Sequence, residues 1–307
     1  MRNKVNRWTQ ERKTMQPLID AYMKINEADK LIVVDGGAAG GLSEPFNVIE
    51  ECITSVRFEP RGQTEIAQSP GCLHIDGGLW DADTVKALHI AKKPATSSIC
   101  PPNTEFLKQF DDTYGAPARE TIKKVNVPLR SIDSCVEKGE MPNPNFIKLD
   151  VHSAELPALL GAKNSLGNCV GLLVETWNSE VHMGQGLNYQ VEQFALENGF
   201  ELYDCVCAAR WQVKHKGQLS DVDKGRYIGS EVLFIKSNVS DDLIIKKAFV
   251  LGLFGFYNDA RNILEQNGEK EREKFLYKAI TEAQLIIRRS LKIKLKSAVR
   301  RVISIAR

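Results

Sequence analysis

Short apolar segments rich in β-branched residues recur along the chain, and stretches with helical spacing separate them. Residues 153–163 and 188–198 predict amphipathic helices, the first capped by Ser153 and the second ended by Gly199. Strands that alternate with helices indicate an α/β fold, here a doubly wound, seven-stranded, mostly parallel sheet. The seven predicted strands are LIVVD (31–35), TSVRFE (54–59), CLHI (72–75), NFIKLDV (145–151), CVGLLVETW (169–177), FELYDCVCAARW (200–211) and SEVLFIK (230–236).

The remaining segments suggest three regions. We predict an N-terminal helical segment over 1–30, a main α/β domain over 31–240 and a C-terminal helical extension over 241–307. The region 76–130 is less regular, with TVKALHIA as one further candidate strand. The longest apolar run, AFVLGLFGF near residue 250, is well short of the roughly 20 residues that cross a membrane. No apolar segment of a signal peptide follows the basic N-terminus, so we expect a cytoplasmic protein.

Charge is unevenly distributed over the 307 residues. Residues 283–307 hold eight Lys or Arg and no acid, which leaves 33 basic and 39 acidic residues in the rest of the chain. The tail from Gln284 to Arg307 has the spacing of a basic amphipathic helix. Two interpretations stand: a helix on an anionic inner membrane surface, or a helix packed on the protein. The acidic body argues against a nucleic-acid partner.

The seven cysteines contain no CxxC pair, which favours a reducing compartment. His, Asp and Glu show no metal-ligand spacing along the chain, so no metal is predicted.

Three acids, Asp35, Glu59 and Asp150, each end a predicted strand, and the glycine-rich loop DGGAAGG follows the first of these strands. Open parallel sheets bind ligands outside the carboxyl ends of their strands, so the three acids are expected to face one crevice. The loop lacks G-x-G-x-x-G, and a carboxylate beside it would repel a pyrophosphate. A ligand with an ammonium, a sulfonium and a ribose suits it better, and S-adenosylmethionine is such a ligand.

Seven motifs in order resemble the FkbM-type methyltransferases, which have the class I S-adenosylmethionine-dependent, Rossmann-like fold. The resemblance covers roughly residues 31–236, and its most specific part is F-I-K-L-D-V-x-x-x-E-L-x-x-L-x-G-A. The family typically methylates hydroxyl groups, often on sugars of glycans, lipopolysaccharides or secondary metabolites. The motifs are VDGGAAGG, RFEP, GLWD, SSICPPN, SIDSCVE, FIKLDVHSAELPALLGAK and GLLVETW.

The resemblance implies roles for several residues. Asp35 is expected near the ammonium of S-adenosylmethionine, and Glu59 is expected to accept hydrogen bonds from its ribose hydroxyls. The loop glycines would let the backbone pass close to the methionine part, and two further residues would lie near the adenine. The remaining predicted cofactor-binding residues are Gly36, Gly37, Gly41, Leu79 and Trp80.

Many relatives have Asp-Val-Glu-Gly where this chain has Asp150-Val151-His152-Ser153. His152 is a candidate general base, because its ordinary pKa of about 6.5 suits proton transfer near neutral pH; a structural hydrogen bond to backbone is the alternative. Asp150 is a candidate for a direct role beside the reacting groups. Glu155 is a third catalytic candidate, although its place in the first helical turn also has a structural explanation.

Three more residues have predicted positions near this region. Lys148 alternates with Asp150 on its strand, which predicts a buried Lys–Asp pair. Glu175 ends a strand and His182 follows in the next loop, so both are within possible reach of a substrate, with a solvated loop position as the alternative for His182.

The sequence thus predicts a methyltransferase that acts on a hydroxyl of a sugar or glycolipid acceptor. Two alternatives stay open: a protein that binds S-adenosylmethionine without transferring its methyl group, and a nucleic-acid methyltransferase.

Overall fold

The computed structural model describes residues 12–26, 29–61, 71–215, 217–220, 222–267 and 271–305, with side chains up to residue 289. Contacts divide the described chain into two compact units. The sheet unit comprises residues 31–42 and 53–238, and the helical unit comprises residues 12–30, 43–52 and 239–305 within the described ranges.

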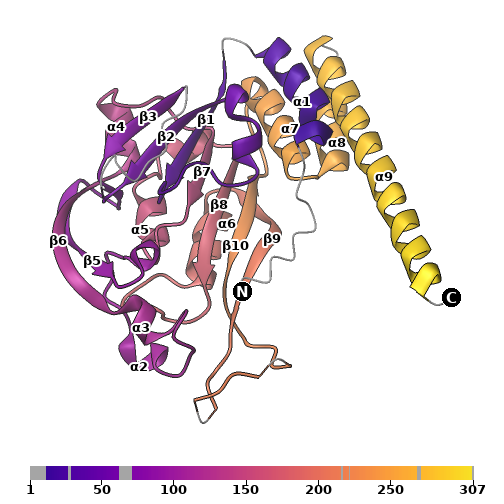
Figure 1. The fold of residues 1–307 in the computed structure, drawn as a ribbon. Helices are drawn as coiled ribbons and strands as arrows, with labels where there is room; N and C mark the ends of the chain where they lie inside the picture. Colours follow the sequence, from indigo (N-terminus) through magenta and orange to yellow (C-terminus); the bar gives the residue numbers. More distant parts are fainter. Residues whose placement is uncertain are drawn as a thin grey trace. The chain divides into compact units, whose positions relative to one another are not determined.

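A seven-stranded sheet forms the centre of the sheet unit, in the order β3-β2-β1-β7-β8-β10-β9 (Figure 1). β10 is antiparallel to β8 and β9, and the other four pairings are parallel. The mostly parallel sheet predicted from the sequence is therefore confirmed. The strands are β1 (Leu31–Gly36), β2 (Ile53–Glu59), β3 (Cys72–Asp76), β7 (Phe146–Leu149), β8 (Gly171–Trp177), β9 (Phe200–Trp211) and β10 (Arg226–Lys236).

The order of this sheet reverses between β1 and β7, since β2 and β3 continue to one side and β8 to the other. Ligands of open parallel sheets bind at such a switch point, outside the carboxyl ends of the strands. β7 and β8 are fully buried, as expected for central strands covered on both faces. β7 ends at Leu149 and β1 ends at Gly36, so Asp150 and the glycine loop both emerge at this edge.

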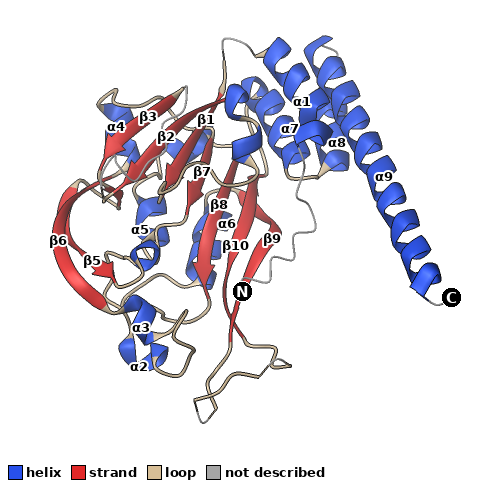
Figure 2. Ribbon diagram, viewed as in Figure 1, coloured by secondary structure: helices blue, strands red, loops and turns tan. Residues whose placement is uncertain are grey.

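A second sheet of three strands, in the order β4-β6-β5, belongs to the same unit (Figure 2). The segment TVKALHIA forms β5 (Thr84–Ala91), as predicted. β4 (Gly78–Leu79) and β6 (Thr121–Arg130) were not predicted. β4 contains only two residues, and β6 has no regular alternation of buried and exposed positions, with half of its ten residues exposed.

Helices of the sheet unit pack on the large sheet through an apolar core. Val34, Ile147 and Leu172 of the strands meet Leu159 of α5 and Val191 of α6 there. The helices are α2 (Thr104–Leu107), α3 (Ala116–Arg119), α4 (Ile132–Glu137), α5 (Glu155–Leu160) and α6 (Asn188–Glu197), with 3₁₀ turns at Pro94–Thr96 and Ser165–Asn168.

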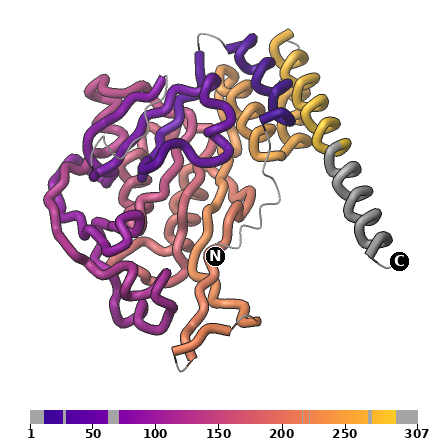
Figure 3. Tube along the Cα trace, in the orientation of Figure 1, coloured from indigo at the N-terminus to yellow at the C-terminus, as the bar shows by residue number. Residues whose placement is uncertain are grey.

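The helical unit joins segments from both ends of the chain. Tyr22 of α1 stacks on Phe249 of α7 at a ring-centroid distance of 3.9 Å, and Leu18 and Ile280 approach Gly252. The apolar run near residue 250 is therefore the buried helix α7. Figure 3 shows α1 beside α9. The elements of the helical unit are α1 (Arg12–Ile25), α7 (Ile244–Leu253), α8 (Tyr257–Asn267) and α9 (Glu271–Ile305), with 3₁₀ turns at Phe46–Val48, Glu50–Cys52 and Asp241–Leu243.

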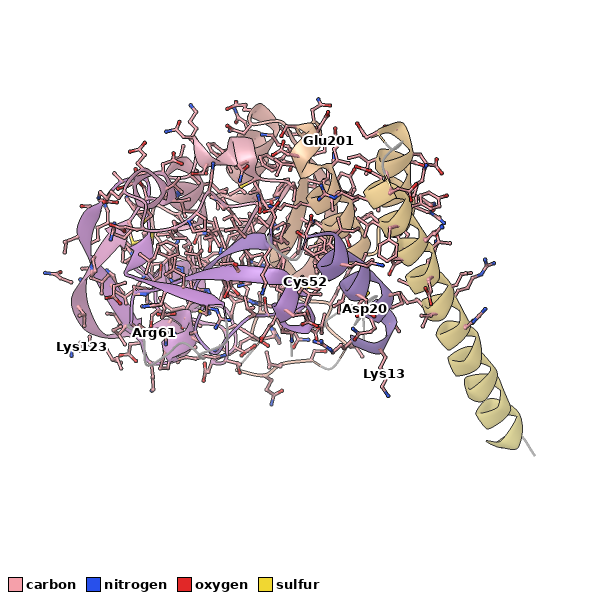
Figure 4. All side chains as sticks on the ribbon, turned by 90° about the horizontal axis from the view of Figure 1, so that it is seen from above. Lys13, Asp20, Cys52, Arg61, Lys123 and Glu201 are labelled. Atoms are coloured by element: carbon pink, nitrogen blue, oxygen red, sulfur yellow. The ribbon has the colours of Figure 1, made fainter. Side chains whose placement is uncertain are left out.

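Many charged side chains are exposed in both units. Lys13 and Asp20 of α1 are exposed, as are Lys123 of β6 and Glu201 of β9 (Figure 4). The backbone of the basic tail belongs to α9 up to Ile305, and the side chains from residue 290 onward are outside the described residues. No helix in the described part of the chain has the length and apolar character needed to cross a membrane.

Candidate active site

A cavity of about 450 Å³ opens at the carboxyl ends of β1, β2, β7 and β8. It is within the size range of small-molecule sites. Residues of the large sheet line it together with Leu79 of β4 and Leu88 of β5 from the small sheet. Of the three acids predicted to face one crevice, Glu59 and Asp150 line this cavity, and Asp35 does not.

One end of the cavity, the cofactor end, is lined by Gly37, Phe58, Glu59 and Leu79. Gly37 has φ +80°, and a Cβ at this position would lie 2.1 Å from the carbonyl oxygen of Asp150. Only glycine therefore allows the loop after β1 to pass so close to the end of β7. The carboxylate of Glu59 accepts hydrogen bonds from the backbone N–H of Arg61 at 3.0 Å and from its Nε at 2.9 Å.

Asp35 is buried against Lys148, with 2.9 Å between Oδ1 and Nζ. The sequence predicted Lys148 to pair with an aspartate on its own strand, but the partner is Asp35 on the neighbouring strand β1. Burial raises the pKa of Asp35, and the charge of Lys148 opposes that shift. The predicted contact between Asp35 and the ammonium of the cofactor gains no support from this geometry.

Three more of the predicted cofactor-binding residues lie away from the cavity lining. A Cβ at Gly36 would lie 2.8 Å from Leu79 Cδ1, so this glycine allows close packing of β1. Gly41 has φ +94°, which favours glycine in the turn. Trp80 packs against the small sheet, and Lys86 Nζ lies 4.6 Å from its ring centroid. Leu79 alone of the two expected adenine neighbours faces the cavity.

The loop after β7 carries two consecutive residues in the left-handed region, His152 at φ 50° and Ser153 at φ 86°. This backbone conformation is strained for residues other than glycine, and it persists where surrounding contacts stabilise it. Here Ser98 Oγ donates to the carbonyl of His152 at 2.5 Å, and Ser153 Oγ lies 2.6 Å from His182 Nδ1. The loop thus presents the imidazole of His152 to the cavity in a fixed position.

Two sequence expectations are corrected by this loop. Ser153 does not cap the helix, because α5 begins at Glu155 with Ala154 as its N-cap residue. His182 is not a solvated loop residue; it is 1% exposed and contacts Ser153.

Glu155 is buried, and its Oε1 accepts hydrogen bonds from the backbone N–H groups of Val151 and Ser153. Glu155 therefore stabilises the loop through these hydrogen bonds and does not line the cavity. Its catalytic role stays a prediction.

His152 and Glu175 form an ion pair in the cavity wall, with 3.3 Å between Nδ1 and Oε2. Burial lowers the pKa of His152, but the charge and hydrogen bonding of Glu175 raise it, and the net result is a pKa of about 8. Burial and the charge of Glu175 also raise the pKa of Glu155 to about 8.

Ligand atoms of Asp150, His152 and Glu175 all lie within 4.8 Å of one another. Two carboxylates and an imidazole in this arrangement could hold a divalent cation. The sequence predicted no metal because its criterion was spacing along the chain. These residues meet only because β7 and β8 are neighbours in the sheet.

The other end of the cavity, the aromatic end, is lined by Tyr114, Arg119, Trp177 and Trp211. Tyr114 stacks on Trp211 at 5.7 Å, and Trp177 meets Trp211 edge-on at 5.9 Å. Arg119 lies over Trp211, with 4.7 Å from its guanidinium carbon to the ring centroid. Sequence reasoning did not find this group. Tyr114 and Arg119 come from the irregular region around α3, and Trp177 and Trp211 end β8 and β9, which β10 separates in the sheet.

Comparison with known proteins identifies the sheet unit. Residues 67–202 match the family model of the methyltransferase FkbM domain. A comparison with curated proteins finds no match. This match covers less than half of the chain, and it assigns residues 67–202 to an S-adenosylmethionine-dependent methyltransferase domain of the FkbM type.

Two solved structures are similar at low identity. One is methyltransferase FkbM from Methylobacillus flagellatus KT, with 14% identity, a TM-score of 0.37 and coverage of 67% of this chain and 44% of that chain. The other is magnesium protoporphyrin IX methyltransferase from Synechocystis PCC 6803 with bound S-adenosylmethionine, with 11% identity, a TM-score of 0.31 and coverage of 74% and 79%. The chain thus spans less than half the length of the FkbM chain that it matches.

The cofactor end fits S-adenosylmethionine in two respects. Glu59 supplies a carboxylate for hydroxyl groups at the end of β2, and Phe58 and Leu79 supply apolar walls for the adenine base. A carboxylate accepts about four hydrogen bonds, so Glu59 can bind ribose hydroxyls as well as Arg61.

Proposed function

We propose that this methyltransferase acts on a hydroxyl group of a sugar in a glycan, lipopolysaccharide or related metabolite. The observation that carries the proposal is the His152–Glu175 pair, which faces the same cavity as the cofactor end. Methyl transfer to oxygen needs a group that accepts the hydroxyl proton close to the methyl donor.

When bound, S-adenosylmethionine supplies a methyl group already activated by its sulfonium. Gly37, Glu59 and Leu79 would hold it, and the protein would mainly align the acceptor and remove a proton. In neutral His152, an Nδ1–H directed at Glu175 leaves the lone pair of Nε2 to accept that proton. Glu175 then stabilises the imidazolium. Glu155 and Ser98 keep the loop in place during this step.

The test is product analysis with purified protein and S-adenosylmethionine carrying a labelled methyl group. The acceptors offered are neutral and acidic methyl glycosides, a phenol and an oligonucleotide. The proposal expects S-adenosylhomocysteine together with label in an O-methyl ether of a glycoside. Label in the oligonucleotide would assign the nucleic-acid alternative, and binding without turnover on any acceptor would indicate a protein that binds the cofactor only.

A glycolipid acceptor would place the enzyme at a membrane surface. The eight cations and no acids in residues 283–307, and the helical backbone of α9, support peripheral binding of the tail to an anionic inner membrane surface. Deleting residues 284–307 should abolish co-sedimentation with anionic liposomes at low salt and spare S-adenosylmethionine binding. Neutral liposomes are the control. Equal sedimentation of the full-length and shortened chains would remove the membrane proposal.

A further inference from the structure

The aromatic end of the cavity contains a hydrogen-bond donor without an acceptor. Trp177 is 3% exposed and lines the cavity, and no described residue accepts a hydrogen bond from its Nε1–H. Buried indole N–H groups normally find a partner, and leaving one unpaired is costly. The cavity lining is where a ligand oxygen would supply that partner.

The surrounding faces suit a ring with an apolar side. Trp177 and Trp211 meet at 66°, and Tyr114 stacks parallel to Trp211 with an interplanar angle of 11°. These rings form apolar walls that meet at an angle. A pyranose has C–H groups on its faces and oxygens around its edge, so it can pack on one ring while an oxygen accepts from Trp177.

Arg119 adds a buried positive charge to the same end. It is 4% exposed, its Nη1 donates to the carbonyl of Tyr114, and its guanidinium carbon lies 4.7 Å from the centroid of Trp211 and 6.0 Å from that of Trp177. A planar guanidinium held against aromatic rings is suited to bidentate recognition of a carboxylate or phosphate. Lys93 adds a further positive charge to the cavity lining.

We propose that the aromatic end is the acceptor subsite and that it selects an anionic sugar, with Arg119 binding the carboxylate or phosphate group, Trp177 donating to a sugar oxygen and Trp211 packing on the ring. This inference rests on the proposed function, because it names the class of sugar whose hydroxyl is presented to His152. His152 and Trp177 line one cavity with ring centroids 6.4 Å apart, so one sugar residue can reach both.

The experiment is calorimetric titration of the full chain, with S-adenosylhomocysteine bound, by methyl glucuronide, glucose 6-phosphate and methyl glucoside. We expect at least one of the anionic sugars to bind about tenfold more tightly than methyl glucoside or better. Arg119→Met should abolish that preference and leave binding of methyl glucoside nearly unchanged. Arg210→Met is the matched control, because it removes the same charge from an exposed position of the lining and should keep the preference.

Trp177→Phe keeps an aromatic ring and removes the N–H. It should weaken binding of anionic and neutral sugars by a similar factor of roughly five. This variant tests the subsite independently if Arg119→Met fails to fold, which thermal unfolding would reveal.

Three results would overturn the inference. They are equal affinity for anionic and neutral sugars, a preference that survives in folded Arg119→Met, and unchanged sugar affinity in Trp177→Phe. In the first two cases the proposed sugar methylation still stands. If no sugar binds while S-adenosylhomocysteine does, the proposed sugar acceptor fails together with the inference.

Discussion

Two pairs of opposite charge lie at the carboxyl edge of the sheet, one between β1 and β7 and the other between the loop after β7 and β8, and they differ in their access to the cavity. Asp35 and Lys148 are 2.9 Å apart with side chains 1% and 6% exposed, and neither lines the cavity. His152 and Glu175 are 3.3 Å apart with side chains 17% and 9% exposed, and both line it. The first pair, the sealed pair, lies between β1 and β7 and is expected to contribute to stability. The second, the open pair, can meet a ligand, and our proposal assigns proton transfer to it.

The largest effect expected from this comparison is on stability. Asp35→Asn leaves Lys148 as a buried cation without its carboxylate, so the free energy of unfolding should fall by about 3–5 kcal/mol. Urea denaturation measures this, with Asp204→Asn on the exposed face of β9 as the control. Affinity of the folded protein for S-adenosylmethionine should change little. Unchanged stability with weakened cofactor binding would instead return Asp35 to the cofactor site, as the sequence first suggested.

Asp35 shows which features of the site the sequence could predict and which it could not. Its place at the end of a strand was predictable, because hydrophobic patterns are local, and β9 matches its predicted bounds of 200–211. Its partner Lys148 lies 113 residues away, and the choice between Asp35 and Asp150 depends on which strands are neighbours. The pairing of His152 with Glu175 and the aromatic end depend on tertiary contacts in the same way. The sequence therefore predicted which charged residues lie at the strand ends, but it did not predict which of them form pairs.

The second effect concerns turnover. His152→Ala should lower kcat by roughly 100-fold or more, because the hydroxyl proton loses its acceptor. S-adenosylmethionine affinity should stay nearly intact, and stability should change much less than in Asp35→Asn because this pair is partly exposed. Steady-state kinetics and calorimetry measure both, with His215→Ala in an exposed segment as the control. Normal turnover in His152→Ala would make this pair structural too, and the contrast between the two pairs would disappear.

A third, smaller effect separates cofactor binding from both pairs. Glu59→Ala should weaken S-adenosylmethionine binding by about 1–3 kcal/mol, the usual cost of losing hydrogen bonds to a charged group. Glu201→Ala, on the outer surface of the same unit (Figure 4), is the control and should have no effect. Equal affinity of the folded Glu59→Ala protein and the unaltered chain would show that Glu59 serves only to hold Arg61.

The smallest expected effect is on the pH dependence of turnover. It is the most specific test of the open pair, His152 and Glu175. A general base must be neutral, and His152 has a pKa of about 8, so about a tenth of the sites are active at pH 7. Turnover should rise about tenfold between pH 7 and a plateau above pH 9. In Glu175→Gln the midpoint should move to lower pH, because burial lowers the pKa of His152 and the raising charge of Glu175 is gone. Asp35→Asn should keep the midpoint of the unaltered chain.

The same profile distinguishes a proton acceptor from a cation at this cluster. If His152 accepts the proton directly, dialysis against EDTA should leave the profile unchanged. Activity that disappears with EDTA and returns with Mg²⁺ or Mn²⁺ would assign Asp150, His152 and Glu175 to a metal ion. In that event the bound cation would lower the pKa of the hydroxyl, and the open pair would contribute ligands to it. The sealed pair would keep its role in either case, because neither Asp35 nor Lys148 lines the cavity.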